Sequence, residues 1–174
     1  MIVIVGESAS GKSSVAKYLT NNCGYKRIVT YTTRAPRHNE VDGFDYYFIQ
    51  EDQFEKLDKQ DFFAETALYN GWRYGSAKKD YTDDSVIVVN PLGLRNLKNS
   101  NIENIFSVYL CVPRRDRLIK CLERGDDIEE AYRRSLSDIW MFDGIEKEVD
   151  LIIKNPNYLL DVQTITNAII NKSI

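Results

Sequence analysis

The most informative chemistry in the chain lies near its start, in the octapeptide GESASGKS at residues 6–13. Two glycines with four residues between them precede a lysine and a serine, which is typical of a loop that cradles phosphates. Its inward-pointing amides would sit at the start of a helix, whose dipole adds partial positive charge. Lys12 can then reach the β- and γ-phosphates of a nucleoside triphosphate, and the Ser13 hydroxyl can bind Mg²⁺.

The predicted triphosphate site extends through this loop into the helix that follows. Glu7 is unexpected there, because a carboxylate close to phosphates is repulsive, and we expect its side chain to point outward. The residues predicted to form the site are Gly6, Glu7, Ser8, Ala9, Ser10, Gly11, Lys12, Ser13 and Ser14.

A second group of basic residues lies in the stretch TYTTRAPRHNEVDGFDYYF at residues 30–48. Arg34 and Arg37 are three positions apart, and Tyr46 follows. Planar guanidinium groups bind phosphate oxygens through paired hydrogen bonds, so these residues suit a second phosphate dianion. Two solvated arginines on a loop are the other interpretation of the same pattern.

Short apolar runs alternate with helical patterns along most of the chain. Continuous runs of Val and Ile suit a parallel sheet covered on both faces, and strand–helix alternation is typical of a doubly wound α/β fold. We expect strands at residues 2–5, 85–89, 105–112 and 151–154, and helices at residues 13–23, 91–99, 114–124 and about 159–172.

The segment after the first helix breaks this rhythm and is rich in tyrosine and basic residues. It predicts an inserted mixed α+β lobe, with short strands at 45–49 and 62–69 and a helix at 51–59. The polar stretch at 123–135 lies between two helices and predicts an irregular segment that acts as a mobile flap, or lid. The predicted parts are a single domain over 1–174, with a core at about 1–29 and 83–174, the inserted lobe at about 30–82 and the lid at about 123–136.

Composition limits the classes of function. The 174 residues have a net charge of −3, so nothing favours binding to nucleic acid or to a membrane surface. Three widely spaced cysteines, Cys23, Cys111 and Cys121, indicate reduced thiols and a cytoplasmic protein. His38 is the only histidine, which excludes a histidine metal cluster. We expect neither a signal peptide nor a membrane-spanning segment.

The motifs and their order closely resemble those of the guanylate kinase family over nearly the whole chain. Members carry a phosphate loop, then TTRxPRxxEVDGxDYxF, then an acidic residue, then YGxS. Here these read TTRAPRHNEVDGFDYYF, Glu65 in FFAET, and YGSA at residues 74–77. The resemblance implies a three-layer P-loop kinase fold, with ATP and Mg²⁺ as cofactors and transfer of a phosphoryl group to GMP or dGMP.

The resemblance also implies a role for each matching residue. Glu65 and Ser76 would read guanine, because a carboxylate accepts hydrogen bonds from N1–H and N2–H₂ while a hydroxyl donates to O6. Adenine would leave Glu65 unpaired. Asn155 matches a family position near the adenine of ATP. The residues expected to hold the GMP phosphate are Thr30, Arg34, Arg37, Tyr46 and Tyr74.

Two stretches depart from the family pattern. VVNPLG stands where the family has DxDxQG, so Asn90 can hydrogen-bond the purine but carries no charge. In the lid, Arg124 matches a family arginine, whereas Ser135 occupies the position of another. Arg134 is one residue early, about 100° around a helix, and either it or Arg133 would take that role. The implied catalytic residues are Lys12, Arg34, Arg124 and Arg134.

Two functions of other classes remain open. A guanylate-kinase-like binding module keeps the fold but has lost the phosphate loop, which is intact in this sequence. A related kinase that acts on another small phosphate, such as a ribose bisphosphate, would not need Glu65 and Ser76 as a pair that reads a base.

Overall fold

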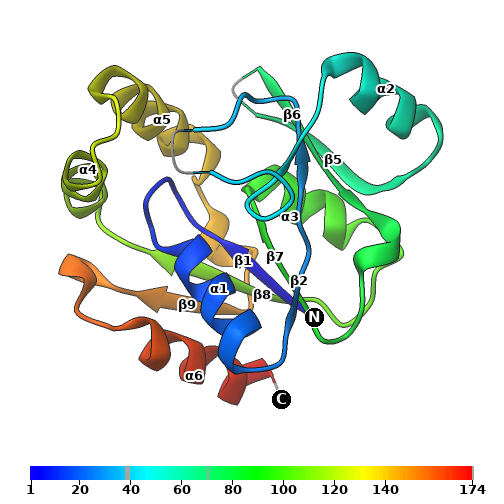
Figure 1. The fold of residues 1–174 in the computed structure, drawn as a ribbon. Coiled ribbons are helices and arrows are strands. Elements are labelled where there is room, and N and C mark those ends of the chain that lie inside the picture. The colour runs from blue at the N-terminus through cyan, green and yellow to red at the C-terminus, as the bar shows by residue number, and fades with distance from the viewer. Residues whose placement is uncertain (38–39, 70, 174) are drawn as a thin grey trace.

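The computed structural model describes residues 1–37, 40–69 and 71–173, so His38 lies outside the described residues. It contains a five-stranded parallel sheet between two layers of helices, which confirms the predicted α/β fold (Figure 1). The strands, in spatial order, are β2 (Lys26–Arg27), β7 (Ser85–Val89), β1 (Ile2–Val5), β8 (Phe106–Cys111) and β9 (Leu151–Lys154).

Helices cover both faces of this sheet. Alternate residues of β1 point to opposite faces, so Ile4 packs against α1 and α6, while Val5 packs on the side of α3 and the end of α5. Because both faces are covered, the strands are apolar throughout, as the sequence predicts. The four helices are α1 (Lys12–Asn22), α3 (Pro91–Lys98), α5 (Ile128–Met141) and α6 (Val162–Ser173).

The central strand β1 holds the start of the phosphate loop in place. It pairs with β7 on one side and β8 on the other, so that Val5 lies opposite Val89 and Tyr109. All four β1 residues have an exposed fraction of 1% or less. The loop that follows therefore begins at the carboxyl edge of the sheet from a fixed point in the core.

A smaller mixed sheet forms the inserted lobe. Phe54 of α2 (Glu51–Lys59) stacks on Phe63 with ring centroids 4.6 Å apart, and this pair fixes the helix against the sheet. The predicted helix at 51–59 is confirmed, whereas two of the four strands, β3 and β6, were not predicted. The strands, in spatial order, are β4 (Tyr47–Phe48), β3 (Tyr31–Thr32), β6 (Trp72–Ala77) and β5 (Phe63–Tyr69).

The lid is more helical than its composition predicts. α4 (Arg114–Glu123) ends where the polar stretch begins, but α5 starts at Ile128, so the prediction of an irregular segment is wrong from that residue onward. The Asp127 side chain caps α5 by accepting a hydrogen bond from the Glu130 amide at 2.9 Å. A capped helix with one buried face forms despite its many charges.

Three short 3₁₀ turns complete the described elements: the first joins strands β6 and β7, and the other two join β9 to α5 and to α6. Over residues 1–37, 40–69 and 71–173, no helix combines the length and the apolar character needed to cross a bilayer. The turns are η1 (Lys78–Asp80), η2 (Ile145–Lys147) and η3 (Pro156–Tyr158).

Gly75 allows the aromatic layer of the inserted lobe to pack closely. A Cβ at this position would lie 2.9 Å from Phe63 and 3.0 Å from Phe54. We expect Gly75→Ala to lower the free energy of unfolding by about 1–3 kcal/mol through overpacking, measured by chemical denaturation. The control is Leu68→Ala, at a position 63% exposed on β5, and its expected change is within about 0.5 kcal/mol. Equal effects of the two changes would contradict this account.

Candidate active site

The phosphate loop leaves the buried end of β1 and closes onto the first turn of α1. Gly6 lies so close to its neighbours that a Cβ there would be 2.5 Å from Ser10 Oγ and 3.0 Å from the Leu110 carbonyl oxygen. Gly11 has a φ of 93°, in the left-handed region that glycine adopts without strain. A side chain at Gly6 would therefore collide with its neighbours, and a side chain at Gly11 would strain the backbone.

This loop forms one wall of a cavity of about 490 Å³ that extends to the inserted lobe and the lid. The cavity is lined by all the residues that the sequence predicts for the site except Glu7 and Ser76. The fold thus brings together residues that are more than a hundred positions apart, from Lys12 to Asn155.

Lys12 lies inside the phosphate loop. Its Nζ donates a hydrogen bond to the Glu7 carbonyl oxygen at 2.7 Å. Burial lowers the pKa of Lys12 to about 8; the carboxylates of Asp138 and Glu7 oppose this shift, and the positive charges of Arg117 and Arg37 add to it. An anion bound beside Lys12 would favour its protonated form.

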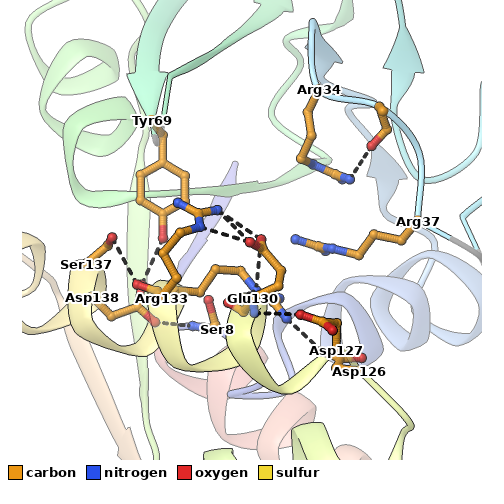
Figure 2. Close-up of polar contacts among 12 residues, drawn as sticks. Ser8, Arg34, Arg37, Tyr69, Asp126, Asp127, Glu130, Arg133, Ser137 and Asp138 are labelled. Carbon is orange, nitrogen blue, oxygen red and sulfur yellow. Dashed lines mark hydrogen bonds and ion pairs between the residues drawn. The ribbon is translucent and has the colours of Figure 1, made fainter.

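Arg34 and Arg37 both pair with Glu40. Figure 2 shows that the two arginine side chains extend into the same space. The N–O distances are 2.9 Å from Arg34 and 3.1 Å from Arg37. The Arg34 guanidinium also lies 5.3 Å from the centroid of the Tyr46 ring, and its Nε is buried without a partner in the described part of the chain. Burial lowers the pKa of Arg37, and the positive charges of Arg34 and Arg134 lower it further. Two guanidinium groups thus share one carboxylate beside the cavity. Since one carboxylate offsets only one of the two positive charges, the pair can bind a further anion.

Glu65 is a buried carboxyl group on the lobe side of the cavity. It is 6% exposed, and burial raises its pKa to about 7, although a hydrogen bond from Ser76 opposes this rise. Ser76 lies behind it: its Oγ donates to Glu65 Oε1 at 2.7 Å and is 2.5 Å from the Tyr81 hydroxyl. Ser76 thus orients the carboxyl group, and its proposed direct contact with a base stays a prediction.

Asn90 lies at the end of β7 and caps the next helix. Its Oδ1 accepts a hydrogen bond from the Gly93 amide at 2.8 Å. Thr30 and Tyr74 line the lobe side of the same cavity, and Thr30 is 8% exposed. The residues predicted to hold the phosphate and the purine therefore face the same cavity.

The lid supplies two arginines to the cavity, and they share one carboxylate. Arg134 is buried and pairs with Asp126 at 2.8 Å, and Arg124 pairs with the same carboxyl group from the more exposed side. Arg133 instead pairs with Glu130 and is 48% exposed (Figure 2). Arg134, one residue away from the position predicted by family spacing, is thus the one directed at the cavity.

Glu7 does not point to solvent, so that prediction is wrong. Its side chain is 12% exposed and turns away from the cavity into the protein. The Tyr109 hydroxyl donates to Glu7 Oε1 at 3.0 Å, and Arg117 Nη2 lies 3.5 Å from the same oxygen. These partners exist because β8 and α4 pack directly behind the loop, which local sequence does not reveal.

The structure adds cavity residues that sequence reasoning missed. Lys120 and Tyr158 line the cavity near the loop, and the Tyr158 hydroxyl donates to the Ala9 carbonyl oxygen at 2.7 Å. Asp138 and Tyr69 line it between the loop and the lobe. Helical spacing could have indicated two of them, because Lys120 lies four residues before Arg124, and Asp138 lies four residues after Arg134.

Asn155 closes the turn after β9. Its side chain donates to the Leu160 carbonyl oxygen at 3.1 Å and accepts from the Leu160 amide at 2.8 Å. Asn155 is 4% exposed and lines the cavity. Its amide therefore holds the shape of this wall, and its contact with an adenine stays a prediction.

Known proteins match this chain over nearly its whole length. The family model of guanylate kinase matches residues 1–170. The chain belongs to the guanylate kinase family. It is 33% identical to a guanylate kinase of Rickettsia bellii, over 99% of this chain and 94% of that one. It is 30% identical to a guanylate kinase of Clostridium acetobutylicum, over 97% of this chain and 80% of that one.

Solved structures show the same fold. The crystal structure of a guanylate kinase from Anaplasma phagocytophilum matches 99% of this chain and 86% of that one, with a TM-score of 0.73 and 24% identity. At that identity the match speaks to the fold alone. The family assignment rests on the family model and the more similar sequences.

The pKa of Glu65 gives a direct test of the site. We expect this carboxyl group to titrate near pH 7, where burial has raised its pKa. Ser76→Ala should raise the pKa further, because the hydroxyl hydrogen bond stabilises the ionised form. Carbon NMR of labelled glutamate side chains in both proteins would measure the two values. Titration of Glu65 near its ordinary value of 4.5 would contradict the buried geometry.

Proposed function

We propose that the protein transfers the γ-phosphoryl group of ATP to GMP, and to dGMP, and so acts in purine nucleotide metabolism. One observation carries this proposal: a single cavity is lined at one end by the phosphate loop and at the other by Arg34, Arg37 and Glu65 of the inserted lobe. Two anionic ligands bound at these ends would meet within it. Membership of the guanylate kinase family supports the same activity.

The donor nucleotide would bind at the phosphate loop. Amides of the loop and the first turn of α1 would hold the β- and γ-phosphates, with the Lys12 ammonium beside them. Mg²⁺ would be held by the Ser13 hydroxyl together with phosphate oxygens and water, and it would neutralise charge on the transferred group. In residues 1–37, 40–69 and 71–173, no group of three His, Cys, Asp or Glu gathers around a metal position, which fits an ion held in this way.

The acceptor would bind against the inserted lobe. Arg34 and Arg37 would bind the GMP phosphate together with the hydroxyl groups of Thr30, Tyr46 and Tyr74. Glu65, oriented by Ser76, would accept hydrogen bonds from guanine N1–H and N2–H₂. Asn90 would face the purine from the sheet edge. Adenine has neither the N1–H nor the N2 amine, so the buried carboxylate would keep its hydrogen bond from Ser76 but gain none from the base.

Phosphoryl transfer needs alignment and neutralisation of charge more than covalent chemistry. The acceptor phosphate is already an anion, so the protein does not need a histidine base. Arg134 and Arg124 of the lid would stabilise the charge that develops on the transferred group, while Lys12 and Arg34 hold its two ends. Closure of the lid would exclude water and limit hydrolysis of ATP.

The division of the chain follows from these roles. We propose that residues of about 30–82 act as the acceptor lobe, 123–136 as the lid, and the rest as the core of one domain. A cytoplasmic location is part of the proposal, because Cys23, Cys111 and Cys121 are all free thiols.

The test is a coupled assay of ADP release with ATP, Mg²⁺ and a series of acceptors. We expect activity with GMP and dGMP, none with AMP, and a catalytic efficiency lowered by about 5- to 150-fold with IMP, which lacks the N2 amine. Lys12→Ala should abolish turnover with an unchanged circular dichroism spectrum.

The alternatives give different results in the same assay. A binding module, which would take a phosphopeptide in the acceptor lobe, would release no ADP with any of these acceptors. A kinase for another small phosphate would release ADP with a ribose bisphosphate but not with GMP. Full activity of Lys12→Ala would overturn the assignment of the donor site.

The lid arginines give a second test. Arg134 lines the cavity and is buried, whereas Arg133 is exposed. We expect Arg134→Met to lower kcat by about 10²- to 10³-fold, and Arg133→Met to stay within about fivefold, as for a surface ion pair. Both variants must have melting temperatures above the assay temperature, so that a loss of activity does not reflect unfolding. A larger loss for Arg133→Met would assign the role to that residue instead.

A further inference from the structure

Asp138 is a buried carboxylate with partners in two distant parts of the chain (Figure 2). It lies on α5 and is 2% exposed. Its Oδ2 accepts a hydrogen bond from the Ser8 amide of the phosphate loop at 2.9 Å. Its Oδ1 accepts a hydrogen bond from the Tyr69 hydroxyl of the inserted lobe at 3.0 Å. We call Ser8, Asp138 and Tyr69 the Asp138 link.

The buried guanidinium of Arg117 pairs with this carboxylate. Arg117 Nη1 lies 3.5 Å from Asp138 Oδ2, and the Arg117 side chain is 7% exposed. Arg117 also donates to the Val112 carbonyl oxygen at 3.0 Å and to the Ser8 carbonyl oxygen at 3.4 Å. One buried guanidinium thus holds α4, the phosphate loop and Asp138 in one arrangement, which fixes the position of the carboxylate.

The other end of the link reaches the proposed acceptor site. The ring centroid of Tyr69 is 6.3 Å from that of Tyr74, which is in turn 6.1 Å from that of Tyr46. Arg34 lies over the Tyr46 ring. Packed side chains therefore connect the phosphate loop, through Asp138 and Tyr69, to the residues that we assign to the acceptor phosphate.

We propose that Asp138 is a positioning residue that sets the distance between the phosphate loop and the acceptor lobe through its hydrogen bonds to Ser8 and Tyr69. The inference rests on the proposed function, because it concerns the alignment of two bound phosphates. Each carboxylate oxygen has a hydrogen-bond donor from the protein, so Asp138 acts through the elements that it joins. A displacement of about 1 Å between reacting groups can cost about 10²-fold in rate.

Steady-state kinetics of Tyr69→Phe and Asp138→Asn test the link. Tyr69→Phe removes one hydroxyl and keeps the ring, and we expect it to lower kcat by about tenfold, with less than about threefold change in the KM of GMP or ATP. Asp138→Asn should lower kcat at least as much, and the double variant should be no slower than Asp138→Asn alone. The matched control is Tyr132→Phe on the exposed side of α5, expected to match the wild type.

Hydrogen exchange at the Ser8 amide, measured by NMR without nucleotides, gives a second readout that does not depend on turnover. We expect Asp138→Asn to speed this exchange by about tenfold or more, since it weakens the hydrogen bond of that amide. The proposal is overturned by unchanged exchange at Ser8, by Tyr69→Phe kinetics equal to those of Tyr132→Phe, or by losses that multiply in the double variant. Absence of GMP-dependent ADP release by the wild type would count against the proposed function, and exchange at Ser8 would still show whether Asp138 holds the loop.

Discussion

Repulsion between anions is the constraint that organises this molecule. The proposed function brings two phosphates together in one cavity, which needs a local excess of positive charge, yet the chain as a whole carries a net charge of −3. The structure meets this need by letting cations share carboxylates. Glu40 serves two arginines, and so does Asp126 of the lid. One carboxylate can offset only one of the two arginines that share it, and all four arginines line the cavity. Arg134 also lies 3.5 Å from Glu130.

The fold makes this concentration of charge possible by supplying fixed points. β1 is buried between two parallel neighbours, so the phosphate loop begins at a rigid place at the sheet edge. The lobe is anchored separately by its aromatic layer of Phe54 and Phe63. Asp138 bridges the two. The lobe also packs on the core where α3 meets β5, and the Asn96 side chain donates a hydrogen bond to the Thr66 carbonyl oxygen there at 2.6 Å.

Features carried by contiguous residues could be predicted from the sequence, and features made by packing could not. The phosphate loop, the strands at 85–89 and 151–154 and the helix at 51–59 follow from local patterns. The partners of Glu7, by contrast, come from a strand and a helix far along the chain. The burial of Arg134 rather than Arg133 depends on which face of α5 meets the core. The spacing of the family motif comes within one residue of Arg134. The direction in which a side chain points is decided by packing, which the spacing does not reveal.

The shared pairing of Arg34 and Arg37 with Glu40 has a consequence for ligand affinity. Long side chains lose rotamer freedom when they are fixed, which costs about 0.5–1.5 kcal/mol for each residue immobilised on binding. Here Glu40 has already restricted both guanidinium groups during folding. An arriving dianion would therefore meet a preorganised pair, and little conformational entropy would oppose its capture.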